Sequence, residues 1–295
     1  MSTPYPHPTG AHPTVPQPAA AAAPEATGYP TASPERARGG RSRPGSPSRG
    51  ATKTAFHTPT PHRGIPLETG DGAGTLSYAL YCVFALSAPL PRDEEERERI
   101  VGESLDYVLA SGAQVRGWYD VGAFRADSDL MVWLLDEDPR VLQDAYHRLR
   151  ASAIGRFLAP VWTCMGAQVP TEFHYGHTPA CFGGVSARDW ATVYPLVRDR
   201  EWYLIDNSER SRLMAECGRR GFSGHPDVKE SVLSAFALSD YEYVVAYEAD
   251  TLDRLEGVMH AQRYTDARSF VREDTPFFTG PRVTLAQWEQ RQPRS

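Results

Sequence analysis

The sequence is poor in cysteine and in long apolar segments, and each shortage excludes a class of protein. The four cysteines lie far apart with no CxxC pair, so neither a zinc site nor a dense disulfide framework is expected. No apolar run reaches the roughly 20 residues that cross a bilayer, and the N-terminus lacks the basic start and continuous apolar core of a secretory signal. We therefore expect a cytoplasmic protein without a membrane span.

Basic residues are in the minority over most of the chain. The net charge is −6, whereas the stretch up to Asp71 carries seven Lys and Arg against four acidic residues, which leaves about −9 for the remainder. An acidic domain lacks a surface that neutralises phosphates, so nucleic acid is not expected as a partner. The basic run from Arg36 to Arg43 is interpreted as part of a solvated tail.

The composition changes near residue 74. Fourteen of the 25 prolines precede residue 71, in a stretch that also concentrates Ala, Gly, Ser and Thr and has almost no apolar period. We interpret residues 1–74 as a disordered tail. A transit peptide is the alternative because the segment is rich in Arg, but its prolines would break the amphipathic helix that such peptides use.

Regular periodicity follows the tail and predicts the same order of elements twice. In the first set, a buried strand over 75–87 precedes a helix that begins near Asp93, two strands, a helix that begins at Asp138 and a strand over 160–168. The second set comprises a helix over 208–222, strands over 228–240 and 241–250, a helix over 252–271 and a strand over 275–280.

This order predicts an α+β protein of two ferredoxin-like βαββαβ repeats, which arose by duplication and form a dimeric α+β barrel. The first repeat would occupy residues 75–184 and the second residues 185–285. Residues 286–295 are expected to be a short polar tail. Helices would cover the outside of the sheets and leave a cavity beneath them.

Four segments of the second half carry a resemblance to a known family: TEFHYGHTPACF, DWATVYPLVRDREWYLID, SERSRLMAECGRRG and VMHAQRYTDARSFVREDTPFFTG. They resemble the actinobacterial coproheme decarboxylase branch of the chlorite dismutase superfamily, over about residues 75–283. The resemblance implies that coproheme, Fe-coproporphyrin III, binds in the second half. Hydrogen peroxide would oxidise two of its propionates to vinyl groups with loss of carbon dioxide. It also implies a homo-oligomer, usually a pentamer.

The resemblance assigns roles to five residues. Tyr194 matches the tyrosine that forms a radical beside a propionate, and His177 matches the distal histidine that takes a proton from peroxide. Arg198 is a candidate partner for a propionate, because a guanidinium holds a carboxylate through two parallel hydrogen bonds. Trp202 matches an aromatic residue near a propionate, and Ala267 a small residue on the distal side. Outside the family context, a core tyrosine, a loop histidine and a surface ion pair would be the simpler interpretations.

The sequence departs from the family at the iron ligand. The usual segment resembles AEHG, whereas this chain has Cys217 in place of the histidine. Cys217 is a small buried apolar residue in one interpretation, and an iron-bound thiolate that favours O–O cleavage in a second. In a third, decarboxylation continues with a changed ligand. Arg219 and Arg220 are the nearest cations that could stabilise a thiolate.

We therefore predict a heme-binding oxidoreductase that converts coproheme to heme b, with Cys217 as the metal ligand. A thiolate-ligated heme oxidase or peroxidase that acts on another small molecule is one alternative. A non-catalytic heme carrier or subunit is the other.

Overall fold

The computed structural model describes residues 76–169 and 178–295, which lie in one compact unit. Both predicted helix starts in the first half are confirmed. Asp93 caps the first helix by accepting a hydrogen bond from the Glu96 backbone nitrogen at 2.8 Å, and Asp138 caps the second, whose first turn holds Pro139. The elements of this half are β1 (Tyr78–Leu86), α1 (Glu94–Leu109), β2 (Gln114–Asp120), β3 (Leu130–Asp136), α2 (Pro139–Ala151), η1 (Ile154–Phe157) and β4 (Leu158–Ala167).

The second half repeats the order strand, helix, two strands, helix, strand, and then continues. The predicted helix over 252–271 is wrong in its length, because the helix ends at Gln262. There the Thr265 hydroxyl donates to the Gln262 carbonyl at 2.8 Å, and the chain turns into a short 3-10 helix. The elements are β5 (Trp190–Arg198), η2 (Arg200–Tyr203), α3 (Asn207–Phe222), β6 (Lys229–Ser234), β7 (Tyr243–Ala249), α4 (Leu252–Gln262), η3 (Asp266–Phe270), β8 (Val271–Glu273), β9 (Phe278–Val283) and α5 (Leu285–Gln290).

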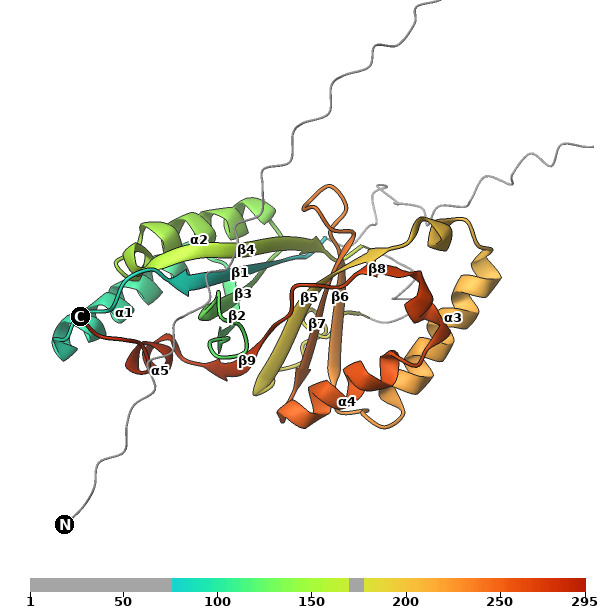
Figure 1. The fold of residues 1–295 in the computed structure, drawn as a ribbon. Coiled ribbons are helices and arrows are strands. Elements are labelled where there is room, and N and C mark those ends of the chain that lie inside the picture. Colours follow the sequence, from blue (N-terminus) through green and yellow to red (C-terminus); the bar gives the residue numbers. More distant parts are fainter. Residues whose placement is uncertain (1–75, 170–177) are drawn as a thin grey trace, which may run out of the picture. The chain divides into compact units, whose positions relative to one another are not determined.

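Strands of both halves pair antiparallel in one sheet that closes on itself, which confirms the predicted α+β class with an antiparallel sheet (Figure 1). The order β7-β6-β4-β1-β3-β2-β9-β5 returns to β7 through a further β5–β7 pairing. In each half the first strand pairs with the third and the fourth: β1 lies between β3 and β4, and β5 lies between β7 and β9. Duplication of one ancestral repeat remains a prediction.

Alternation along the strands separates two faces of this sheet. On one face, residues from both halves share an apolar cluster that includes Tyr81, Met131, Val193 and Ala246. On the other face, the first half packs under α1 and α2, while β5, β6 and β7 pack against α4 and the end of α3. No helix among the described residues is long and apolar enough to span a membrane.

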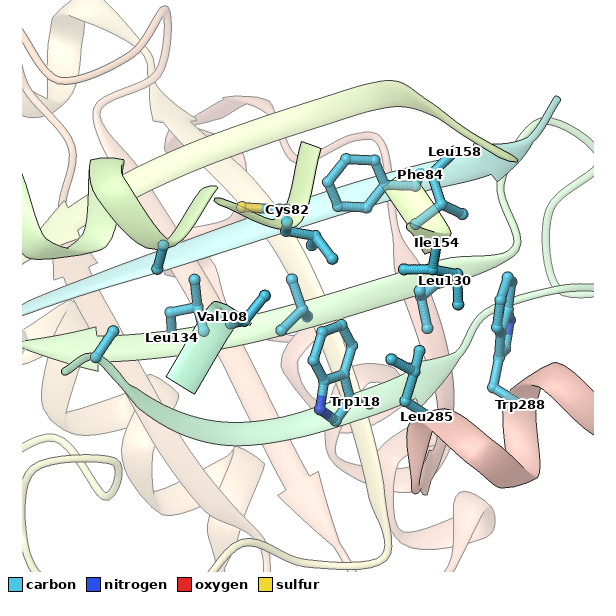
Figure 2. Close-up of a cluster of buried hydrophobic side chains, with 14 of the residues drawn as sticks. Cys82, Phe84, Val108, Trp118, Leu130, Leu134, Ile154, Leu158, Leu285 and Trp288 are labelled. Atoms are coloured by element: carbon cyan, nitrogen blue, oxygen red, sulfur yellow. The ribbon is translucent and has the colours of Figure 1, made fainter. Parts of the chain in front are cut away.

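The predicted polar tail over 286–295 is wrong, because this segment contains the helix α5. Leu285 and Trp288 are 1% and 0% exposed and belong to the apolar cluster of the first half, as Figure 2 shows beside Leu130. Glu289 forms an ion pair with buried Arg97 at 2.5 Å. Only two apolar residues of α5 are buried, Leu285 and Trp288, which is too few for a periodic signal in a short segment.

Candidate functional site

A cavity lies in the second half between strands β5, β6 and β7 and helices α3 and α4. It has about 580 Å³ of empty space, including the solvent at its mouth. Alternate residues of β5 reach it, so Tyr194, Leu196 and Arg198 line the wall while Val193 faces the opposite side of the sheet. Its apolar lining is completed by Met214, Val232, Val245, Met259, Ala267 and Val271.

Tyr194 lies in the strand wall of this cavity and is 4% exposed. Its ring stacks on Phe277 at 4.6 Å between centroids and lies 6.2 Å from the ring of Tyr247. Burial raises the pKa of the Tyr194 hydroxyl, and the charge of Glu230 adds to this effect, although a hydrogen bond with Tyr247 opposes it. Tyr194 therefore stays protonated near neutral pH.

Arg198 is held firmly at the end of β5. Its guanidinium lies 4.2 Å from the centroid of the Trp202 ring, and Nη1 donates to the Ala267 carbonyl at 3.2 Å. The Arg198 backbone nitrogen donates to Glu242 Oε2 at 2.7 Å. These contacts fix a cation in the cavity wall, two strand residues beyond Leu196.

Trp202 and Ala267 belong to one small buried cluster with Leu213, and Met214 and Cys217 pack against it. The Trp202 ring packs against the Arg198 guanidinium. Trp202 is 0% exposed and is not part of the cavity lining. Ala267 lies in η3 and does line the cavity. Cys217 packs against the same buried cluster, and a position of Ala267 on the distal side of a bound porphyrin stays a prediction.

Cys217 lines the cavity from α3, one turn after Leu213. Burial raises the pKa of its thiol, and the charge of Glu230 raises it further, whereas Arg198 and a hydrogen bond with Thr265 lower it. Arg198 is thus the cation that acts on this sulfur. The expectation for Arg220 is wrong, because its exposed side chain turns back to Glu216 at 3.0 Å.

Sequence reasoning missed the polar residues that share the cavity with Tyr194 and Cys217. Glu230 of β6 and Tyr247 of β7 are directly opposite each other in the sheet, and Gln262 ends α4 above them. Glu230 follows Val228 and precedes Val232 at alternate positions, so a charged residue at a core-facing position was the available signal. His177, the predicted distal histidine, lies outside the described residues.

These residues suit an iron porphyrin. The cavity has apolar walls that could cover a flat macrocycle, a cysteine sulfur that could bind iron, and a fixed Arg198 that could pair with a carboxylate. Arg263 and Arg268 also line it, and both donate to Asp274 at 2.8 and 2.7 Å.

Comparisons with known proteins agree with this geometry. A family described as chlorite dismutase matches residues 97–283. A coproheme decarboxylase of Mycolicibacterium smegmatis is 39% identical over 216 residues, which span 72% of this chain and 92% of that protein.

Solved structures are also similar. A mutant chlorite dismutase of Candidatus Nitrospira defluvii has a TM-score of 0.64 at 20% identity, and that enzyme in complex with imidazole has 0.62 at 19%. Both comparisons cover 72% of this chain and 94% of the other. At these identities the likeness concerns the fold.

Proposed function

This chain belongs to the chlorite dismutase family, and we propose that it is a coproheme decarboxylase that uses hydrogen peroxide to convert two propionates of Fe-coproporphyrin III to vinyl groups. The observation that carries the proposal is the meeting of Tyr194, Arg198 and Cys217 in one cavity, from a strand and a helix on facing walls. For each propionate, the β-carbon would lose a hydrogen and the carboxylate would leave as carbon dioxide, which releases two electrons and one proton. One hydrogen peroxide for each propionate would take up these, with one proton from water, and become two waters.

In this proposal some residues bind the porphyrin and others take part in the reaction. Cys217 would hold the iron, and the apolar side chains of the cavity would hold the macrocycle. Arg198, fixed by Trp202 and by the Ala267 carbonyl, orients a propionate through its guanidinium. Tyr194 supplies a phenol that gives up a hydrogen atom and then recovers one from the β-carbon of the propionate. The bound iron porphyrin supplies the redox chemistry with peroxide. His177 is proposed as the group that takes the peroxide proton.

The cysteine leaves a second candidate open, a thiolate-ligated heme oxidase or peroxidase for another small molecule. It is favoured by one observation: Glu230 also faces the cavity as a carboxyl group with a raised pKa, and it adds a further acid–base group. A non-catalytic carrier is a third candidate. We also propose that the chain works in the cytoplasm and assembles as a homopentamer.

The test adds coproheme to the purified full-length chain and records the absorption spectrum after reduction, with and without carbon monoxide. Peroxide is then added, and the porphyrin is followed by mass spectrometry. Loss of two carboxyl groups supports the decarboxylase, whereas a thiolate-type spectrum with intact propionates supports the second candidate. Tyr194→Phe should bind coproheme and fail to convert it. Tyr241→Phe is the matched control, because Tyr241 packs on the opposite face of the sheet.

A further inference from the structure

We propose that Tyr247 and Glu230 form a proton relay that accepts the hydroxyl proton of Tyr194 when Tyr194 is oxidised. This inference rests on the proposed function only for the identity of the porphyrin substrate. It adds two residues that the family resemblance did not indicate, both on the same wall of the cavity as Tyr194.

Strand register brings the three side chains together. Glu230 of β6 pairs directly with Tyr247 of β7, and Tyr194 of β5 pairs with Val245, two residues before Tyr247. Side chains that are directly or diagonally opposite on one face of a sheet are close enough for such contacts. Accordingly, the Tyr247 hydroxyl lies 2.8 Å from Glu230 Oε1, and the rings of Tyr194 and Tyr247 lie 6.2 Å apart between centroids, both in the lining of the cavity.

The hydrogen bonds around Tyr247 determine the direction of the relay. A phenol has one proton to donate and two lone pairs to accept. Gln262 Nε2 is a donor and lies 2.7 Å from the Tyr247 oxygen, while the Glu230 carboxylate can only accept. The proton of Tyr247 therefore points to Glu230, and the second lone pair of the Tyr247 oxygen is left to accept a proton from Tyr194.

This chain of donors balances the oxidation of Tyr194. One electron leaves Tyr194 for the oxidant generated from hydrogen peroxide. The Tyr194 proton moves to the Tyr247 oxygen while the Tyr247 proton moves to Glu230. The products are a neutral Tyr194 radical, an intact Tyr247 phenol and a protonated Glu230.

The proton need not stay on Glu230. Reduction of peroxide to water consumes one proton for each electron, and Glu230 lines the cavity in which that reduction would occur. When the Tyr194 radical takes a hydrogen atom from substrate, its hydroxyl is restored. Burial raises the pKa of the Glu230 carboxyl, which makes it a better proton acceptor than an exposed carboxylate, although the hydrogen bond from Tyr247 opposes this.

The experiment compares wild type with Glu230→Gln, Tyr247→Phe and Tyr241→Phe, each as the full chain with bound coproheme. Gln at 230 can still accept a hydrogen bond from Tyr247 but is a poor base, so it separates the relay from packing. After addition of peroxide, rapid freeze-quench electron paramagnetic resonance follows the tyrosyl radical, in water and in deuterium oxide. Tyr194→Phe identifies the signal, and mass spectrometry of the same samples follows the porphyrin.

We expect the radical on Tyr194 to appear about 100-fold more slowly in Glu230→Gln and in Tyr247→Phe, and unchanged in Tyr241→Phe. The wild type should show a solvent isotope effect that both relay variants lose. Equal rates in all proteins would overturn the relay, as would conversion by wild type with no radical on Tyr194.

Failure of the proposed function gives a different result. If wild type forms the relay-dependent radical but leaves both propionates intact, the relay holds and the substrate is another molecule. If wild type converts coproheme and both relay variants match it in radical rate and isotope effect, the decarboxylase holds and the relay is wrong.

Discussion

Asp274 lies in the cavity wall between two arginines. Arg263 and Arg268 both donate to its Oδ2, and their charges lower the pKa of this carboxyl even though burial acts in the opposite direction. A lowered pKa in the folded state stabilises the protein above the pKa of the unfolded chain, and this contribution is lost as the pH falls.

We predict that Asp274→Asn lowers the free energy of unfolding at pH 7 by about 1.5 to 3 kcal/mol, the range for hydrogen bonds to charged groups. The difference from wild type should narrow as the pH falls below about 4, because Asp274 of the unfolded chain then takes up a proton, whereas the folded protein with its lowered pKa does so only at a still lower pH. Urea unfolding at several pH values measures this. The control Asp144→Asn removes an exposed ion pair with Arg148 and should cost at most about 1 kcal/mol. A difference that does not change with pH would contradict the prediction.

Among individual residues, the sequence predicted some of those that line the cavity. Tyr194, Arg198 and Cys217 were found through motifs, and the structure brings all three into the lining of one cavity. Glu230 and Tyr247 were not found, because their significance comes from the register between β6 and β7. Register depends on which strands pair, and that is a property of the closed sheet rather than of either segment.

The C-terminal helix α5 shows how a short element can matter for stability. Trp288 is completely buried under the strands of the first half, and its Nε1 donates to the Asp129 carbonyl at 3.0 Å. We predict that Trp288→Ala lowers the free energy of unfolding by about 3 to 5 kcal/mol, since the substitution leaves a large cavity. Gln290→Ala, on the exposed side of the same helix, should change it by no more than about 0.5 kcal/mol. If Trp288→Ala lowers the free energy of unfolding by no more than Gln290→Ala does, α5 contributes little packing.

The boundaries of helices were predictable where a local signal sets them and not where contacts distant in the sequence do. The helix starts at Asp93 and Asp138 were predictable because a capping carboxylate is a local signal. The end of α4 was not, since apolar residues continue at helical spacing beyond Gln262. The chain leaves the helix there because Thr265 bonds back to the Gln262 carbonyl and Ala267 packs against Trp202.

At the scale of the whole molecule, one buried ion pair joins the two halves. Arg116 of β2 and Glu248 of β7 approach to 2.6 Å with side chains 4% and 1% exposed. Removal of one partner leaves the other charge buried alone, so Glu248→Ala should cost about 3 to 5 kcal/mol in urea unfolding. The double variant Arg116→Met with Glu248→Leu should lose less than the single one. Asp250→Ala, which removes an exposed pair with Arg188, serves as the control.

The N-terminal segment bears on the whole molecule in a different way. Pairings among residues 78–283 already close the sheet, and the cavity residues all follow residue 193. The proline-rich composition of residues 1–70 predicts too little apolar surface to offset the entropy of ordering. We therefore predict that deletion of residues 1–70 leaves the thermal midpoint and the coproheme affinity unchanged, as measured by calorimetry and by spectral titration. A lower midpoint with unchanged affinity would mean that the segment packs on the fold, and weaker coproheme binding alone would mean that it reaches the cavity.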